Sequence, residues 1–295
     1  MTADAATAYA APAKVNLTLH LLGKRADGYH LLDSLVVFAG VGDQLQVAPA
    51  DSLVLEESGP GAGTMGSGED NLVLRAARLL IETCAPELRA RIRLEKRLPV
   101  AAGLGGGSSD AAAALIALDA LWGCGLQAEE LQSLGAAVGA DVPVCLYGRP
   151  AWVGGIGEAL ETAERMPPVW FVLVNPGVSL STASVFRARS GGFSEPLRWH
   201  QPPGDAATLA AWLAQGRNDL QAPACALEPA IPAVLEALAA TPDCLLARMS
   251  GSGATCFGLY TEEAEARHAA QLLAEARPDW WVRAAPLLTD PIERG

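Results

Sequence analysis

One run of eight residues, Gly103-Leu104-Gly105-Gly106-Gly107-Ser108-Ser109-Asp110, constrains this chain more than any other segment. It follows a charged, strand-like segment and precedes an alanine-rich run, 111–121, that we expect to form a helix. Glycine has no Cβ, so its backbone N–H can approach a ligand closely and its φ can be positive. The start of a helix adds unpaired N–H groups and a partial positive charge. With two hydroxyls beside them, these groups predict an anion site, and phosphate is the usual anion.

The run differs from three common nucleotide-binding loops. A Walker loop needs Lys and then Ser or Thr after its last glycine, whereas Ser108 and Ser109 follow Gly107 directly. The dinucleotide fingerprint needs glycine in place of Ser108 and a buried parallel strand before it, but residues 91–96 alternate charged and apolar. A protein-kinase loop joins two strands, whereas this one leads into a helix. A flexible linker is the remaining alternative, although linkers rarely lead straight into strong helix formers.

Composition narrows the class of protein. A chain of 295 residues, half of them hydrophobic, can bury a large core and is expected to form two domains. The net charge of −12 argues against nucleic acid as a partner, because phosphate backbones need basic surfaces. No apolar run reaches the length of a transmembrane helix, and residues 1–13 do not resemble a signal peptide. We therefore expect no membrane partner and a cytoplasmic location.

Six cysteines, at positions 84, 124, 145, 225, 244 and 256, show no C-x-x-C pairing, and the four histidines are scattered. This pattern predicts neither a zinc site nor a disulfide framework. Small buried thiols in a reducing compartment are the expected alternative.

Hydrophobic periodicity places the expected elements of the first half. Residues 14–22 alternate strictly, with Lys14, Asn16, Thr18 and His20 on the polar face. A turn at 24–28 and a glycine-rich loop at 59–68 follow, and Asp70-Asn71 is expected to cap a helix. Further strands are expected at 31–38, 44–47, 53–56 and 91–96, and helices at 72–84, 111–121 and 128–138.

The chain turns polar and proline-bearing around 158–168, which predicts a boundary between domains 1–163 and 164–295. The second half contains a second glycine turn, 247–253. Strands are expected at 169–174, 255–260 and 281–284, and helices at 182–187, 206–215, 231–240 and 262–276. Strands and helices mix without regular alternation, so the expected fold class is α+β.

Three groups of residues could carry chemistry. Lys14 and Asn16 could form a polar patch, although an exposed lysine that protects a sheet edge is the alternative. Asp141, between Gly139 and Pro143, could be a helix N-cap or a functional carboxylate in an apolar neighbourhood. The neighbours Tyr29 and His30 suit a flat heteroaromatic ligand, since one can stack and the other can hydrogen-bond, but they could also flank an ordinary hairpin.

Three motifs together resemble those of the GHMP kinases, which transfer the γ-phosphoryl group of ATP to small metabolites. They are Pro-Ala-Lys-Val-Asn-Leu at 12–17, Pro-x-x-x-Gly-Leu-Gly-Gly-Gly-Ser-Ser at 99–109, and Ser-Gly-Ser-Gly-Ala at 250–254. Within the family, segments 26–30, 70–72, 96–99 and 139–143 resemble those of members whose acceptor carries a cytidine diphosphate group.

The resemblance implies a two-domain GHMP kinase fold. Its N-terminal domain is like ribosomal S5 domain 2, with a left-handed βαβ crossover, and its C-terminal domain is ferredoxin-like. It also implies roles for single residues. Lys14 and Asp141 take the catalytic positions, and Asn16, Tyr29, His30, Thr182 and Phe186 bind the acceptor, with Tyr29 and Phe186 on either side of the cytosine. ATP is bound by Asn71 and Lys96, near the adenine, and by Pro99, Val100, Ala101, Ala102, Gly103, Leu104, Gly105, Gly106, Gly107, Ser108 and Ser109.

The resemblance implies ATP and Mg²⁺ as cofactors, but no carboxylate matches the magnesium-binding Glu of mevalonate kinases, so the metal ligands stay open. Two rival functions are also left. Another GHMP kinase, acting on homoserine or mevalonate, would keep the loops without needing Tyr29 and His30. A dinucleotide-dependent oxidoreductase would need a Rossmann unit, which the charged strand before the glycine loop disfavours. The sequence predicts nothing about oligomeric state.

Overall fold

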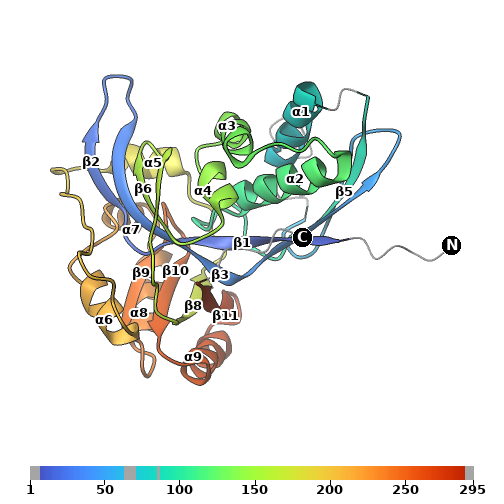
Figure 1. Ribbon diagram of the computed structural model, residues 1–295. Coiled ribbons are helices and arrows are strands. Elements are labelled where there is room, and N and C mark those ends of the chain that lie inside the picture. Colours follow the sequence, from blue (N-terminus) through green and yellow to red (C-terminus); the bar gives the residue numbers. More distant parts are fainter. Residues whose placement is uncertain (1–6, 63–70, 85–86, 290–295) are drawn as a thin grey trace.

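The computed structural model describes residues 7–62, 71–84 and 87–289. Figure 1 shows β1 and β3 running through the middle of the molecule, with α1 to α4 on one side and α6, α8 and α9 on the other. The strands are β1 (Ala8–Asn16), β2 (His20–Lys24), β3 (His30–Pro49), β4 (Val54–Ser58), β5 (Ala90–Glu95), β6 (Ala151–Gly155), β7 (Ala159–Thr162), β8 (Trp170–Asn175), β9 (Leu246–Met249), β10 (Cys256–Tyr260) and β11 (Trp281–Leu288). The helices are α1 (Leu72–Cys84), α2 (Gly106–Trp122), α3 (Ala128–Val138), α4 (Val142–Tyr147), α5 (Thr182–Ala188), α6 (Ala206–Leu213), α7 (Gln221–Leu227), α8 (Ala230–Ala239) and α9 (Glu263–Ala276).

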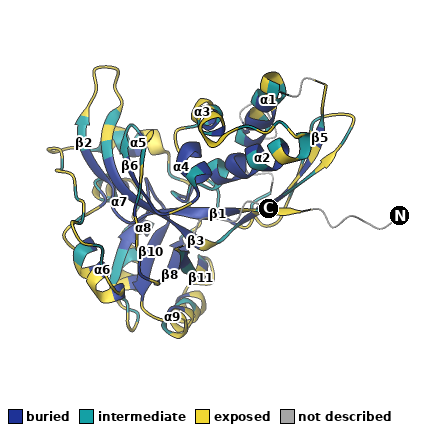
Figure 2. Ribbon diagram, viewed as in Figure 1, coloured by how far each residue is buried: buried dark blue, intermediate teal, exposed yellow. Residues whose placement is uncertain are grey.

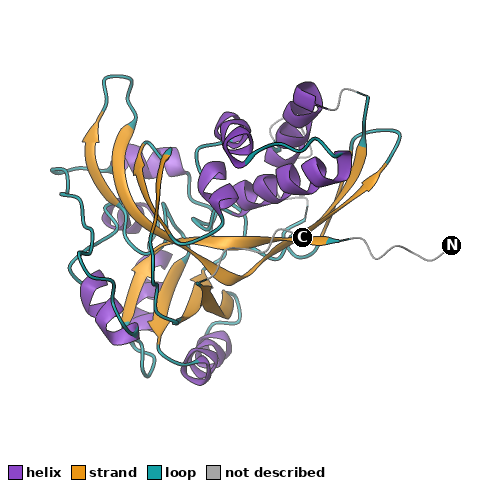
Figure 3. Cartoon of the chain, viewed as in Figure 1, coloured by secondary structure: helices purple, strands orange, loops and turns teal. Residues whose placement is uncertain are grey.

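The strands join into one sheet in the order β4-β5-β3-β11-β8-β10-β9, with β1, β2 and β6 also paired to β3 and β7 paired to β6. Figure 3 shows these strands between separate groups of helices, which confirms the α+β class. β4 and β5 run parallel, and α1 lies between them in sequence. The strand pairs Leu287–Ala39 and Leu288–Phe38 tie the C-terminal half of the sheet to the N-terminal half.

β3 is the largest departure from the predicted elements. The sequence predicted separate strands at 31–38 and 44–47, but one strand of 20 residues spans both, so that prediction was wrong. Gly40 and Gly42 lie between them, and glycine inside a strand often marks a close backbone approach. A Cβ on Gly42 would lie 2.5 Å from Pro12 Cα, and one on Gly40 would lie 2.8 Å from Pro286 Cγ. The two glycines therefore let β1 and β11 approach a continuous strand closely as its antiparallel neighbours.

The predicted strand at 14–22 is divided into β1 and β2, and its polar face is not exposed. Lys14, Asn16, Thr18 and His20 are between 1% and 6% exposed. Figure 2 shows the middle of β1 and β3 in the colour of buried residues, between the two groups of helices. Lys14 is thus a buried cation rather than a surface lysine.

Several other boundaries also shift. α1 and α3 match the predicted ranges, whereas α2 begins at Gly106 instead of 111. α7, β6 and β7 were not predicted, and β11 extends four residues beyond the predicted strand. Asn71 caps α1 as expected, since its Oδ1 accepts from Val73 N at 2.9 Å, while its predicted partner Asp70 lies outside the described residues.

A buried ionic cluster holds the two ends of the glycine run in place. We call Asp43, Lys96 and Asp110 the Lys96 cluster. Lys96 Nζ donates to Asp43 Oδ2 and, at 2.6 Å, to Asp110 Oδ2, and all three residues are at most 1% exposed. Asp43 Oδ1 accepts from the backbone N–H groups of Arg97 (2.5 Å) and Leu98 (2.8 Å). β3, the end of β5 and the first turns of α2 are therefore fixed to one another.

Cys84, at the end of α1, and Cys124, just after α2, form a disulfide. This contradicts the expectation of free thiols for this pair. The two cysteines are 40 residues apart and come together only because α1 packs against α2, which their spacing did not indicate. Cys145, Cys225, Cys244 and Cys256 are free.

Within the described part of the chain, no helix is both long enough and apolar enough to cross a membrane. The domain boundary at residues 163 and 164 stays a prediction.

The close approach of β1 to β3 gives a direct test of the fold. In Gly42→Ala the new Cβ would collide with the backbone of Ala11 and Pro12. We expect a loss of about 1–3 kcal/mol in the free energy of unfolding, measured by urea denaturation. Gly204→Ala is the control, because a Cβ there meets no atom within 4 Å, and its stability should change by less than about 0.5 kcal/mol. Equal stability of the two variants would contradict the close approach of β1 to β3 at Gly42.

Candidate active site

The glycine run forms a turn and the first turn of α2. Gly105 is the N-cap, with φ of 62° in the left-handed region that glycine favours. The first bond of the helix joins Ser109 N to Gly105 O at 2.8 Å. The N–H groups of Gly106, Gly107 and Ser108 precede that bond, and these three residues line a cavity. The structure therefore presents a helix N-terminus to the cavity, as an anion site requires.

The three motifs meet at this turn. Lys14 N donates to Leu104 O at 2.8 Å, and Asn16 N donates to Ser250 Oγ at 3.1 Å. Ser250 Oγ in turn donates to Gly103 O at 3.0 Å. A Cβ on Gly103, whose φ is 75°, would lie 2.9 Å from Gly253 N. The three motifs thus touch through backbone groups and the Ser250 hydroxyl, with no room for a side chain at Gly103.

Lys14 and Asp141 form an ion pair with a separation of 2.9 Å between Lys14 Nζ and Asp141 Oδ2. The side chain of Lys14 is 6% exposed and that of Asp141 is 51% exposed, so the carboxylate faces the cavity. Asp141 occupies the N-cap position of α4, with proline in the first turn, but its side chain makes no capping hydrogen bond. The geometry therefore favours a carboxylate paired with Lys14 over a helix cap.

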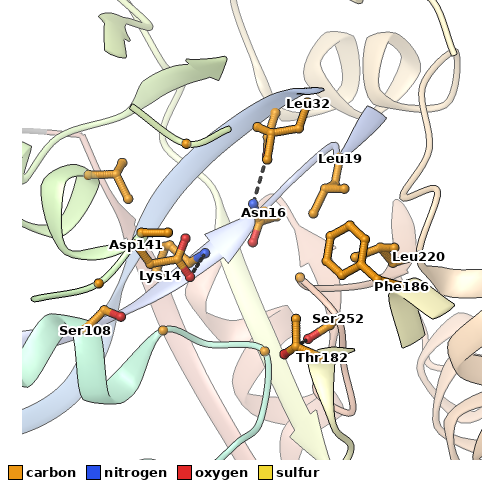
Figure 4. A pocket seen from close by; sticks show the side chains of 18 of the residues that line it. Lys14, Asn16, Leu19, Leu32, Ser108, Asp141, Thr182, Phe186, Leu220 and Ser252 are labelled. Atoms are coloured by element: carbon orange, nitrogen blue, oxygen red, sulfur yellow. Dashed lines mark hydrogen bonds and ion pairs between the residues drawn. The ribbon is translucent and has the colours of Figure 1, made fainter. Parts of the chain in front are cut away.

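The cavity has a volume of about 940 Å³, which is enough for two small substrates. Figure 4 shows Lys14, Asp141 and Ser108 on one side, and Phe186, Leu220, Thr182 and Ser252 on the other, with Asn16 between them. Asp141 is the only carboxylate among its described lining residues.

Asn16 and Thr182 are placed by their neighbours. Asn16 Nδ2 donates to Ser34 Oγ at 2.8 Å, and Ser34 Oγ donates to Thr18 O at 2.6 Å. Asn16 Oδ1 is buried and has no hydrogen-bond partner among the residues that the structure describes. Thr182 Oγ1 and Ser252 Oγ are 2.8 Å apart, which links α5 to the third motif. Both predicted residues line the cavity.

The aromatic residues lie at the far end of the same cavity. Tyr29 is 60% exposed, and the rings of His30 and Phe186 pack with centroids 5.1 Å apart. Burial, and then the charges of Lys24 and Arg189, lower the pKa of His30 below its usual value. His30 is therefore neutral near pH 7 and can both donate and accept a hydrogen bond. The predicted sandwich of Tyr29 and Phe186 around a base stays a prediction, because Phe186 contacts His30 in this structure.

Most of the predicted ATP-binding residues line the cavity. Asn71, Leu104 and Ser109 are not among its lining residues. Asn71 caps α1 and also donates to Glu57 Oε1 at 3.3 Å, and Leu104 packs into the core. Lys96 does line the cavity, but its ammonium group is bound within the Lys96 cluster. Pro99, Val100, Ala101, Ala102, Gly103, Gly105, Gly106, Gly107 and Ser108 all line it.

Sequence reasoning did not single out several residues of the site. Lys24 and Arg187 line the cavity near the aromatic residues, and neither forms an ion pair within the described residues. Asp43 and Asp110 complete the Lys96 cluster. The sequence pattern around Asp110 could have pointed to the cluster, because an acid inside an alanine-rich helix is expected to be buried with a partner. No sequence pattern pointed to Asp43, because its partner Lys96 lies 53 residues away.

Comparison with known proteins gives a consistent result. The family model "GHMP kinases N terminal domain" matches residues 71–149, and "GHMP kinases C terminal" matches residues 200–278. The chain is 60% identical to 4-diphosphocytidyl-2-C-methyl-D-erythritol kinase of Paramagnetospirillum magneticum, over 95% of this chain and 98% of that protein. It is 54% identical to the protein of the same name from Parvibaculum lavamentivorans, over 92% and 95% of the two chains.

Solved structures agree with these relatives. A crystal structure of 4-(cytidine 5'-diphospho)-2C-methyl-D-erythritol kinase has a TM-score of 0.79 at 39% identity, covering 95% of this chain and 99% of that chain. A homoserine kinase from Cytophaga hutchinsonii shares the fold with a TM-score of 0.69 at 17% identity, covering 99% and 96% of the two chains. The predicted two-domain kinase fold is confirmed, and this chain belongs to the GHMP kinase family.

Proposed function

We propose that this chain uses ATP to phosphorylate the 2-hydroxyl of 4-diphosphocytidyl-2-C-methyl-D-erythritol, a step in the non-mevalonate route to isoprenoid precursors. The observation that carries the proposal is the placement of the Lys14–Asp141 pair. It lies between the glycine turn at one end of the cavity and Tyr29, His30 and Phe186 at the other. The relatives with 54–60% identity support the same acceptor.

Asp141 is the group that receives the proton. A sugar-like alcohol is a poor nucleophile at neutral pH, so Asp141 orients the hydroxyl and accepts its proton while the oxygen–phosphorus bond forms. The bond between the γ-phosphorus and the bridging oxygen breaks, and ADP leaves with that oxygen. The Asp141 carboxylate is half-exposed, so the acceptor hydroxyl can reach it from the cavity.

Lys14 and the glycine turn stabilise the negative charge. Lys14 holds Asp141 in place at 2.9 Å and has further N–H bonds to offer to a phosphoryl oxygen. Gly106, Gly107 and Ser108 line the cavity at the start of α2, so their N–H groups would bind the phosphates of ATP. Such preorganised donors are usually the largest single contribution to phosphoryl transfer.

The residues around the proposed phosphate site fit a magnesium ion that binds together with the nucleotide. Mg²⁺ usually takes most of its ligands from phosphates and water, with few from protein. Among the described residues there is no group of three or more His, Cys, Asp or Glu that could hold a metal. The Ser108 hydroxyl, on the cavity wall, is the group that would hold the ion. The ion would neutralise charge on the phosphates.

The acceptor end of the cavity matches an anionic nucleotide. Lys24 and Arg187 offer positive charge for a diphosphate, and neutral His30 offers both a donor and an acceptor to the edge of a cytosine. We propose a small-molecule acceptor and neither nucleic acid nor membrane as partner. The expected cytoplasmic location stays a prediction, and the Cys84–Cys124 disulfide would be unusual there.

The acceptor is tested by measuring ADP release with three alcohols. We expect turnover with the cytidylyl acceptor and none with homoserine or mevalonate. Stacking on an aromatic ring is worth about 1–3 kcal/mol, so Tyr29→Ala should raise the acceptor KM roughly 5- to 150-fold and leave the ATP KM unchanged. Phe193→Ala is the control, because Phe193 is also an exposed aromatic residue but does not line the cavity. Turnover of homoserine or mevalonate alone would refute the proposed acceptor, but it would still show that the chain is a kinase.

The role of Asp141 is tested by Asp141→Asn. This change keeps the shape of the side chain but removes the proton acceptor, so kcat should fall by roughly 10²–10⁴. Stability should change little, because Asp141 is half-exposed and makes no cap, and the amide keeps an oxygen for Lys14. Asp205→Ala is the contrasting control: Asp205 caps α6 and accepts from Thr208 N, so its loss should cost about 0.5–2 kcal/mol without changing kcat. An Asp141→Asn variant that turns over normally but unfolds more easily would show that Asp141 is a cap.

The glycine turn is tested by Gly105→Val. A Cβ on Gly105 would lie 3.0 Å from Lys14 Cε and would occupy the approach to the helix N-terminus. We expect ATP affinity, measured by calorimetry, to be severely reduced. Gly123→Val is the matched control, since Gly123 caps the other end of α2 with a φ of 66° and its Cβ would meet no atom within 4 Å. Wild-type affinity in a folded Gly105→Val protein would rule out phosphate binding by this turn.

A further inference from the structure

Asn218 uses its whole side-chain amide on groups behind the cavity. Its Nδ2 donates to Met249 O at 2.8 Å and to Gly251 O at 2.7 Å, and its Oδ1 accepts from Leu220 N at 2.9 Å. The residue is 5% exposed. Because a carbonyl can only accept and a backbone N–H can only donate, these partners fix which end of the amide faces which segment. A carboxylate of the same shape could make only the bond to Leu220.

The backbone around Asn218 is fixed to the connection between β1 and β2. Leu19 N donates to Arg217 O at 2.9 Å, and Asp219 N donates to Leu19 O at 2.8 Å. Asn218 therefore lies opposite Leu19 in a parallel bridge. Through its backbone and its amide together, this one residue joins the end of the first motif, the start of α7 and the third motif.

The segments joined in this way form one part of the cavity wall. Leu19, Leu220 and Gly251 line the cavity, whereas Asn218 is not among its described lining residues. Figure 4 shows Leu19 and Leu220 beside Phe186, and the three side chains belong to one hydrophobic cluster. We call Leu19, Leu220 and Gly251 the Asn218 wall.

The glycine turn is held by other contacts. Lys14 N donates to Leu104 O at 2.8 Å, and the Lys96 cluster fixes the start of α2. Loss of the Asn218 amide should therefore displace the Asn218 wall and leave the proposed phosphate site in place.

We propose that Asn218 is a positioning residue for the acceptor: its amide holds the Asn218 wall in register with the third motif, so that the acceptor hydroxyl reaches Asp141. The inference rests on the proposed function, because it takes the cytidylyl acceptor as the molecule that contacts this wall. Asn218 acts only through the segments that it holds. Since a displacement of about 1 Å can cost roughly 100-fold in rate, a small movement of the wall is visible in turnover.

Asn218→Asp tests the donor end of the amide. The carboxylate keeps an oxygen for Leu220 N but cannot donate to the two carbonyls, so kcat/KM for the cytidylyl acceptor should fall roughly 10- to 100-fold. The Kd and the stoichiometry of ATP binding, measured by calorimetry without acceptor, should stay as in the wild type. Asn218→Ser is smaller and uncharged, and it should lose less because a hydroxyl does not repel the carbonyls. A side chain that only filled space would give the reverse order, because Asp has nearly the shape of Asn.

Asn175→Asp is the matched control. Asn175 is 2% exposed, and its Oδ1 accepts from Gly177 N at 2.8 Å. This is the same contact, two residues along the chain, that Asn218 makes with Leu220. Asn175 Nδ2 donates to Thr255 Oγ1, a hydroxyl that can turn and donate to a carboxylate. The control should therefore turn over the acceptor as the wild type does.

Wild-type kcat/KM in a folded Asn218→Asp protein would overturn the proposal, and so would a larger loss in Asn218→Ser than in Asn218→Asp. A loss of ATP binding together with turnover would also overturn it, because Asn218 would then hold the whole site rather than its acceptor end. A wild type that binds ATP but does not turn over the cytidylyl acceptor would instead refute the acceptor in the proposed function and, with it, this inference.

Discussion

The contact between three backbone segments is the constraint on which the site depends. β1 donates from Lys14 and Asn16, the glycine turn accepts at Gly103 and Leu104, and Ser250 joins the two. These segments lie more than 80 residues apart in sequence and meet with no space for a Cβ at Gly103. Because the contact joins residues from both ends of the chain, the site can be built only when both halves of the sheet are in place.

Two sets of charged side chains, the Lys14–Asp141 pair and the Lys96 cluster, lie near this contact and differ in their exposure to solvent. Lys14 and Asp141 form a pair whose carboxylate is half-exposed and faces the cavity, whereas the Lys96 cluster is buried and fixes the start of α2. An exposed pair can exchange partners with a substrate at small cost, and a buried one cannot. The groups proposed to react are thus separate from the groups that hold the glycine turn in shape.

The sequence predicted the parts of this site that depend on local pattern or motif. α1 and α3, the half-exposed strand β5 and the site residues of the three motifs could be found in this way. It could not predict features that arise from distant packing. The continuity of β3 depends on the close approach of β1 at Gly42 and of β11 at Gly40, and Asp43 meets Lys96 across 53 residues. The Cys84–Cys124 disulfide depends on how α1 lies against α2.

The most direct test of the account is a crystal structure with a non-hydrolysable ATP analogue and the cytidylyl acceptor. The account predicts that the phosphates contact the N–H groups of Gly106, Gly107 and Ser108, and that the base lies beside Tyr29. It also predicts that the acceptor 2-hydroxyl lies within about 3.2 Å of the Asp141 carboxylate, the reach of a general base. An acceptor bound with that hydroxyl far from Asp141, or phosphates held away from the start of α2, would contradict it.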